Sequence, residues 1–270
     1  MKNSLKLQTD DNMLDEIVAK TKERLVEAKQ NKSLDQLIGE VSKLEINEDF
    51  PFKEALKDSE IAIIAEVKKA SPSKGLISRD FDYIKIAREY EEAGASAISV
   101  LTEPYFFKGS NDFLREISEN VSIPILRKDF TIDEYMIYEA KLLGASAVLL
   151  IVSILDDAQL KEYLDLSHNL GLSAIVETHD ANEIKTALDA GAEIIGVNNR
   201  NLADFTVDIE NSIRLRSLVG DDVVFISESG IKTKEDVTRL KENNVDAVLI
   251  GETLMRSEDK KSMIFELKNG

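Results

Sequence analysis

The sequence predicts a closed (β/α)8 TIM barrel, an α/β fold, with a helical extension at its N-terminus. From Ile61 onward, short apolar runs alternate with longer segments whose apolar residues recur at helical spacing. The apolar runs have the length of buried strands and cover residues 61–65, 96–101, 123–127, 146–152, 172–176, 193–197, 223–227 and 246–250. Such alternation is typical of a parallel α/β fold. Eight strands without a G-x-G-x-x-G fingerprint favour the closed barrel over a doubly wound sheet.

The segments between the strands are expected to be helices, over residues 81–93, 133–143, 156–170, 180–190, 209–218 and 233–243. Three of them end in a repeated Gly-Ala pair, at Gly94, Gly144 and Gly191, and the next strand follows directly. Glycine at these positions favours a left-handed helix cap. Asn243-Asn244 forms a weaker fourth copy. The repeat therefore supports a chain built from successive strand–helix units.

The first part of the chain is charged and helical, and it differs from the periodic part that follows. Residues 11–30 carry one apolar stripe, and Ser33 begins a second helix with a capping-box pattern. A short helix over 52–58 is expected before the first strand. We predict that residues 1–59 form a helical extension packed on the barrel and that residues 60–270 form the catalytic barrel.

Composition limits the classes of function. The formal net charge of −17 argues against nucleic acid and anionic membranes as partners, and an anionic substrate needs a local basic site. No apolar run reaches the roughly 18 residues that span a bilayer. The chain has no cysteine, which excludes a thiolate nucleophile, and only two histidines. We expect a cytoplasmic monomer that uses lysine and carboxylate chemistry and needs no metal or cofactor.

Polar residues follow most of the predicted strands, and in a barrel the C-terminal strand ends form one active face. Glu66 and Lys68 end the first strand and point to the same side, because side chains two apart on a strand share a face. An acid and an ammonium group placed together can shift each other's pKa and exchange protons. The expected acid–base group comprises Glu66, Lys68, Lys128, Glu177 and Asn198. Taken singly, each residue has a structural alternative: an internal ion pair for Glu66 and Lys68, a surface lysine for Lys128, a helix N-cap partner for Glu177 and a turn residue for Asn198.

A second zone has the features of a phosphate site. Ser229-Gly230 follows the seventh strand and Gly251 the eighth, where barrel enzymes commonly hold a phosphate with backbone amides. Ser71 and Arg200 lie after neighbouring strands and are expected to close this site. Ordinary turn glycines are the alternative. Two aromatic residues, Phe107 and Phe130, are candidates for a flat pocket that takes an aromatic ring.

These residues lie in segments that resemble the indole-3-glycerol-phosphate synthases. The matching segments occur in the family's order and are Ile64–Ser73, Leu101–Ser110, Pro124–Phe130, Val176–Glu177, Gly196–Leu202, Ser227–Ile231 and Leu249–Glu252. The resemblance implies a (β/α)8 barrel that converts 1-(2-carboxyphenylamino)-1-deoxyribulose 5-phosphate to indole-3-glycerol phosphate in tryptophan biosynthesis. The reaction releases CO2 and water.

The resemblance also implies a role for each residue of the acid–base group. Lys128 would be the general acid that activates the substrate carbonyl, and Lys68 would bind the substrate carboxylate and could share in proton transfer. The resemblance leaves open which lysine donates which proton. Glu177 would act as base or acid in the later dehydration. Glu66 would position Lys68, and Asn198 would orient the substrate.

The remaining roles concern binding of the small phosphorylated substrate. The resemblance implies that the phosphate binds at Ser71, Ser229, Gly230 and Gly251. Phe107 would line the pocket for the anthranilate ring, and Arg200 would contact the substrate. Glu228 lies near the site in a role that the resemblance leaves open.

Two other functions are possible for a barrel of this kind. One is a related phosphate-binding isomerase, such as phosphoribosylanthranilate isomerase, and the other is a non-catalytic phosphate-binding barrel. Lysines after the first and third strands, together with the lack of cysteine, argue against the isomerase. A non-catalytic barrel would leave the paired interior lysines and acids unexplained.

Overall fold

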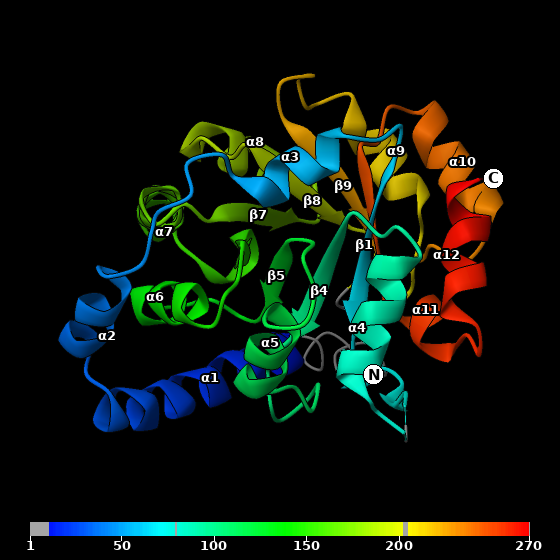
Figure 1. Ribbon diagram of the computed structural model, residues 1–270. Helices are drawn as coiled ribbons and strands as arrows, with labels where there is room; N and C mark the ends of the chain where they lie inside the picture. Colours follow the sequence, from blue (N-terminus) through cyan, green and yellow to red (C-terminus); the bar gives the residue numbers. More distant parts are fainter. Residues whose placement is uncertain (1–10, 79, 202–204, 270) are drawn as a thin grey trace, which may run out of the picture.

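Eight parallel strands form a closed barrel in the computed structural model, which describes residues 11–78, 80–201 and 205–269. Around the barrel the strands follow the order β1-β10-β9-β8-β7-β6-β5-β4 (Figure 1). Their bounds are β1 Ala62–Val67, β4 Ala97–Leu101, β5 Ile125–Lys128, β6 Ala147–Ile151, β7 Ser173–Thr178, β8 Ile194–Asn198, β9 Val224–Glu228 and β10 Ala247–Ile250. Each strand overlaps one predicted apolar run, so the predicted fold class is confirmed.

Helices surround the barrel and connect its strands. They are α4 Tyr83–Glu92, α5 Asn111–Ser118, α6 Glu134–Leu142, α7 Asp157–Asn169, α8 Ala181–Ala190, α9 Glu210–Arg216, α10 Lys234–Glu242, α11 Glu252–Arg256 and α12 Lys260–Lys268, with a 3-10 turn over Val152–Ile154. The predicted left-handed caps are confirmed at Gly94, Gly144, Gly191 and Asn244, whose φ angles are 82°, 83°, 92° and 57°. Sequence reasoning did not predict α5, α11 or α12. Helix α5 is only eight residues long and buries just Leu114 and Ile117, which is too short a stripe to stand out.

Side chains along each strand alternate between the barrel lumen and the surrounding helices. On β1, Ile64 packs in the lumen among residues of the other strands, whereas Ile63 packs against the helices. Glu66 and Lys68 follow Ile64 at a spacing of two residues and lie on the same side of the strand. The prediction that they share the interior face is therefore confirmed. Phe52, from the helix before β1, packs into the same lumen cluster at the N-terminal end of the barrel. The open end is therefore the C-terminal one, where Glu66 lies.

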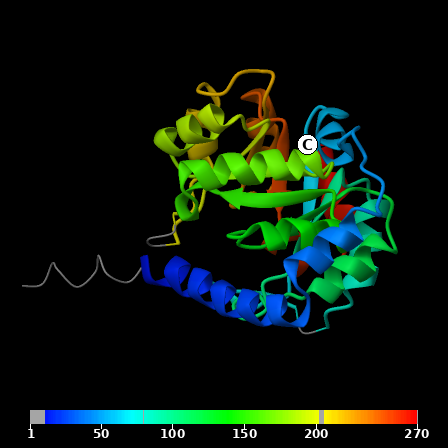
Figure 2. The same ribbon diagram turned by 90° about the vertical axis from the view of Figure 1, so that its left-hand side faces the viewer.

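The N-terminal extension forms three helices, α1 Asp11–Asn31, α2 Leu34–Val41 and α3 Pro51–Lys57. Ser33 caps α2 in the predicted capping box. Helix α1 lies on one side of the barrel and α3 on the opposite side (Figures 1 and 2). Ile17 of α1 reaches the cavity at the C-terminal end. These contacts support an extension packed on the barrel, and the boundary at residue 59 stays a prediction.

The loop predicted after β1 contains a small hairpin. Strands β2 Ala70–Ser71 and β3 Gly75–Leu76 pair antiparallel, so Ser71 lies in a strand and not in open loop. The two-residue strands are too short to show an alternating pattern in the sequence. Among the described helices, none is long and apolar enough to cross a membrane.

Candidate active site

One cavity of about 630 Å³ opens at the C-terminal end of the barrel. It is lined by every residue that was predicted for the site, namely Glu66, Lys68, Ser71, Phe107, Lys128, Glu177, Asn198, Arg200, Ser229, Gly230 and Gly251. The nitrogens of Lys68 and Lys128 therefore open onto the same space. The predicted convergence of the strand ends is confirmed, whereas the role of each residue stays a prediction.

Glu66 and Lys68 form a close ion pair on the lumen face of β1. The Glu66 Oε1 to Lys68 Nζ distance is 2.5 Å, and the two side chains are largely buried. A Cβ atom at Gly251, at the end of β10, would collide with both groups. Glycine at this position therefore leaves room for the ion pair, in addition to any part in binding a phosphate.

Lys128 stands at the centre of the charged group. Its Nζ donates a hydrogen bond of 2.5 Å to Glu228 Oε2 and one of 3.1 Å to Glu177 Oε2. The other oxygen of Glu177 accepts a hydrogen bond of 3.1 Å from Asn198 Nδ2. These side chains come from β5, β7, β8 and β9. They meet because the C-terminal ends of parallel strands lie at the same end of the barrel.

The two carboxylates beside Lys128 differ in their tendency to hold a proton. Burial raises the pKa of Glu177, but Lys128 and then His179 more than reverse this effect, so the pKa lies below 4.5. Burial also raises the pKa of Glu228, Lys128 opposes it only in part, and Glu177 adds repulsion, so the pKa reaches about 7. Burial acts to lower the pKa of Lys128, but Glu228 and Glu177 override it and the net pKa is raised. Lys128 and Glu177 are thus charged, and Glu228 can hold a proton near neutral pH.

Glu228 is the main functional candidate that sequence reasoning left without a role. Its Oε1 has no hydrogen-bond partner among the described residues, and a Cβ at Gly196 would collide with it. A signal was available, because Val224 and Ile226 alternate into the lumen and Glu228 follows at the same spacing. Glu228 therefore belongs to the acid–base group.

The turn after β9 has an unusual backbone. Ser229 and Gly230 both have left-handed φ angles, of 67° and 91°. A buried side chain supports this turn, since Asn199 Nδ2 donates 3.1 Å to the Ser229 carbonyl and 2.9 Å to Ser227 Oγ. Further basic and hydroxyl residues line the same cavity, namely Lys74, Lys232, Thr253 and Arg256. Sequence reasoning did not include them, because nothing local marks an exposed lysine or arginine as facing a cavity.

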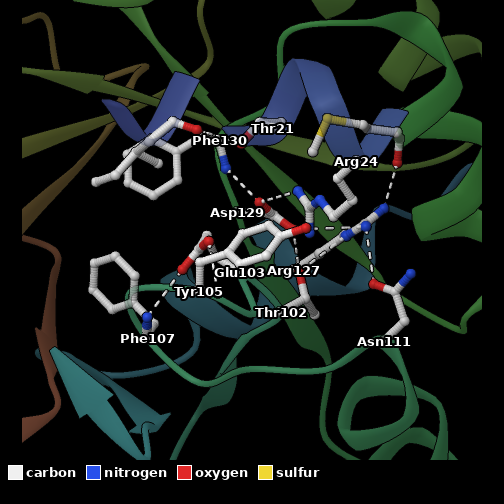
Figure 3. A network of polar contacts seen from close by, with 12 residues as sticks. Thr21, Arg24, Thr102, Glu103, Tyr105, Phe107, Asn111, Arg127, Asp129 and Phe130 are labelled. Carbon is white, nitrogen blue, oxygen red and sulfur yellow. Dashed lines mark hydrogen bonds and ion pairs between the residues drawn. The ribbon is translucent and has the colours of Figure 1, made fainter. Parts of the chain in front are cut away.

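Two aromatic side chains, Phe107 and Phe130, also line the cavity and form an aromatic wall; both are labelled in Figure 3. The rings of Phe107 and Phe130 lie 6.0 Å apart between centroids. Glu103 shapes the loop that carries Phe107, since its carboxylate accepts hydrogen bonds from the backbone N–H groups of Tyr105, Phe106 and Phe107 at 2.9, 2.7 and 2.9 Å. Three backbone hydrogen bonds thus hold the loop that carries Phe107, and a flat pocket for an aromatic ring stays a prediction.

Asp129 joins this wall to helix α1 (Figure 3). Arg24 of α1 donates two hydrogen bonds to its carboxylate, at 2.8 and 3.0 Å, and Thr102 Oγ1 donates a third at 2.6 Å. Leu14 and Ile17, from the same helix, line the cavity. The Arg24–Asp129 pair therefore holds an apolar part of the cavity wall in place.

The comparisons with known proteins agree with this geometry. A family model described as indole-3-glycerol phosphate synthase matches residues 14–267. The chain belongs to this family. The indole-3-glycerol phosphate synthase of Ruminiclostridium cellulolyticum is 56% identical over 95% of this chain and 98% of its own length. The synthase of Endomicrobium trichonymphae is 55% identical over 95% of this chain and 100% of its own length.

A further synthase, from Leuconostoc mesenteroides, is 52% identical over 95% of this chain. Among solved structures, 3-hexulose-6-phosphate synthase from Salmonella typhimurium superposes with a TM-score of 0.63 at 15% identity, covering 77% of this chain and 97% of that one. That likeness supports the barrel fold of this synthase family member. Within the described residues, no group of three or more His, Cys, Asp or Glu side chains is arranged to hold a metal ion. The expected lack of metal and cofactor stays a prediction.

Proposed function

We propose that this chain catalyses the reaction of its family, the conversion of 1-(2-carboxyphenylamino)-1-deoxyribulose 5-phosphate to indole-3-glycerol phosphate. One observation carries the proposal. A buried ammonium group, Lys128, lies between Glu177 and Glu228, two carboxylates with opposite pKa shifts, inside a cavity that also offers an aromatic wall and a candidate phosphate turn. Titratable groups whose environments separate their pKa values are typical of acid–base catalysis.

The bonds that change define what the site must do. A carbon–carbon bond forms between the ring carbon that bears the carboxylate and the ketone carbon of the sugar chain, whose oxygen takes up a proton. The bond to the carboxylate then breaks and CO2 leaves, which restores the aromatic ring. Finally the new hydroxyl and a proton from the neighbouring methylene group leave as water. The site therefore needs a proton donor first and a proton acceptor later.

Lys128 is suited to donate the first proton. Its ammonium group is kept charged by the two carboxylates and points into the cavity. Glu228, with a pKa of about 7, can return a proton to Lys128 across their 2.5 Å hydrogen bond. Glu177 stays ionised and can take the methylene proton during dehydration, or return it to the leaving hydroxyl.

The other residues are assigned to binding. Lys68, fixed by Glu66, would hold the substrate carboxylate, and Asn198 would orient the sugar hydroxyls. Phe107 would contact the anthranilate ring. The phosphate would bind at Ser71, Ser229, Gly230 and Gly251, with Arg200 contacting the substrate nearby.

Indole fluorescence gives a direct test, because the chain contains no tryptophan. Purified protein mixed with the substrate should develop indole fluorescence on a dark background and release one CO2 per indole formed. A well-folded protein that gives neither signal would contradict the proposed reaction. An isomerase of the phosphoribosylanthranilate class is disfavoured, since the family model and the three relatives named above are synthases. The monomeric state, the cytoplasmic location and the lack of nucleic-acid binding stay predictions.

A further inference from the structure

One partly buried titratable group beside the site has no part in the proposed reaction. His179 directly follows the β7 strand that carries Glu177, and its side chain is 18% exposed. It lies outside the lining of the cavity, so it cannot touch a substrate there. Its Nε2 lies 3.7 Å from Glu177 Oε1 and has no hydrogen-bond partner among the described residues. A buried ring nitrogen in this position needs an explanation.

The other side of the imidazole ring is firmly held. Glu183, on helix α8, accepts a hydrogen bond of 2.7 Å from the His179 backbone N–H, and the same oxygen lies 3.0 Å from Nδ1. Because a carboxylate only accepts hydrogen bonds, Nδ1 must carry the proton in this contact. The orientation of the ring then points Nε2 at Glu177.

This arrangement decides which form of the ring is compatible with Glu177. A neutral ring protonated on Nδ1 would turn its Nε2 lone pair toward the carboxylate, whereas an imidazolium turns an N–H toward it. The charged groups around the ring are Glu177 on β7, Glu183 on α8 and Glu228 on β9, with Lys128 on the far side of Glu177. Burial opposes the charged form of His179, but the hydrogen bond to Glu183 and the charge of Glu177 outweigh it, and the net pKa lies above 6.5.

We propose that His179 is a positioning residue whose imidazolium holds the Glu177 carboxylate ionised and aimed into the cavity. The proposal rests on the proposed function for the role of Glu177, and it extends that function to a residue behind the reacting groups. Lys128 and Asn198 fix Glu177 from the cavity side, and His179 fixes the same carboxylate from behind. Loss of this charge should make Glu177 easier to protonate, so that the base is lost as the pH falls.

The contact can be tested without any reaction. The chain has only two histidines, so an untagged H168Q variant leaves His179 as the only imidazole in a long-range ¹H–¹⁵N NMR titration. His168 packs against Phe50, away from the cavity lining, and is a matched control position. We expect the His179 midpoint to fall by at least about half a pH unit when E177Q is added, because the coupling between two charged groups is reciprocal. A smaller change would overturn the proposal.

Kinetics test the consequence for the reaction. H179Q should lower kcat by about tenfold with KM within about twofold, and the acidic limb of the kcat–pH profile should move upward by at least about half a pH unit. H168Q should leave both unchanged. A folded H179Q enzyme whose kcat–pH profile has the same acidic limb as the wild type would overturn the proposal. If H179Q fails to fold, the NMR titration alone tests the proposal. A wild-type chain without synthase activity would refute the proposed function. The NMR titration would still test the contact between His179 and Glu177.

Discussion

Two polar clusters meet where strand β5 ends, and their buried charges are compensated to different extents. Lys128 points into the lumen, and the next residue, Asp129, points toward helix α1. Both Asp129 oxygens are satisfied, by Arg24, by the Thr102 hydroxyl and by the backbone N–H of Phe130. Burial raises the pKa of Asp129, but the charges of Arg24 and of the buried Arg127 outweigh it, and the net pKa is lowered.

The lumen cluster is less well compensated. Its three carboxylates, Glu66, Glu177 and Glu228, share two ammonium groups, Lys68 and Lys128. One oxygen of Glu228 lacks a hydrogen-bond partner among the described residues, and its pKa is raised to about 7. Removing one partner of a fully paired buried charge is costly, whereas a buried carboxylate that is incompletely paired can hold or release a proton near neutral pH. Two adjacent residues at the end of β5 therefore differ, since Asp129 belongs to a fully hydrogen-bonded cluster and Lys128 to a group that can exchange protons.

The largest expected effect comes from removing the centre of the lumen cluster. Lys128→Ala should lower kcat by at least about 100-fold, the lower end of what a positioned acid contributes, while substrate binding largely persists. The measurement is indole fluorescence under saturating substrate. Lys57→Ala, on helix α3 beyond the other end of the barrel, serves as the control and should keep normal turnover. Near-normal turnover in Lys128→Ala would remove Lys128 from its role.

Breaking the Asp129 cluster should affect stability and binding and leave turnover nearly intact. Arg24→Met removes two hydrogen bonds to a buried carboxylate, and we expect the free energy of unfolding to fall by about 1.5–3 kcal/mol. KM should rise because Leu14 and Ile17 of α1 line the cavity. Urea unfolding and steady-state kinetics measure the two effects, with exposed Lys20→Met as control. A loss of kcat comparable with that of Lys128→Ala would contradict the division between the clusters.

The raised pKa of Glu228 predicts a pH-dependent stability difference. Between the unfolded pKa near 4.5 and the folded pKa of about 7, the folded chain binds a proton that the unfolded chain releases, so stability falls as pH rises through this window. The Glu228→Gln side chain cannot bind or release this proton, so the variant's free energy of unfolding should not fall in the same way as the pH rises. We expect equal unfolding free energies for both proteins at pH 4.5 and a variant more stable by about 1–3 kcal/mol at pH 8. Parallel stability curves over this range would show that the Glu228 pKa is not raised.

The smallest expected effect concerns the aromatic wall. Phe107→Leu removes the ring that faces Phe130 and should raise KM by about 2- to 10-fold with little change in kcat, as expected for the loss of one aromatic contact. Phe265→Leu, at an exposed position on α12, is the matched control and should leave KM unchanged. A fall in kcat without a change in KM would place Phe107 among the reacting groups and not in the binding wall.

Local patterns were enough to predict the barrel and many, but not all, of the residues at its open end. The alternation along β1 correctly placed Glu66 and Lys68 together, because the side-chain period of a strand is a local property. The hairpin at Ser71 and helix α5 were missed, since both are too short for a periodic signal. The contact between His179 and Glu177 was not predicted either. The sequence analysis used only the small number of histidines and not their positions after the strands.

The sequence by itself determined the order of strands and helices and which residues end each strand, because periodicity and caps depend on neighbours in the chain. Only the tertiary structure decided which of these charges meet. Lys128 contacts Glu177 and Glu228 at separations of 49 and 100 residues, and no local pattern encodes such pairs. The opposite pKa shifts of the two carboxylates arise from burial and from distances to other charges, which exist only once the barrel has closed.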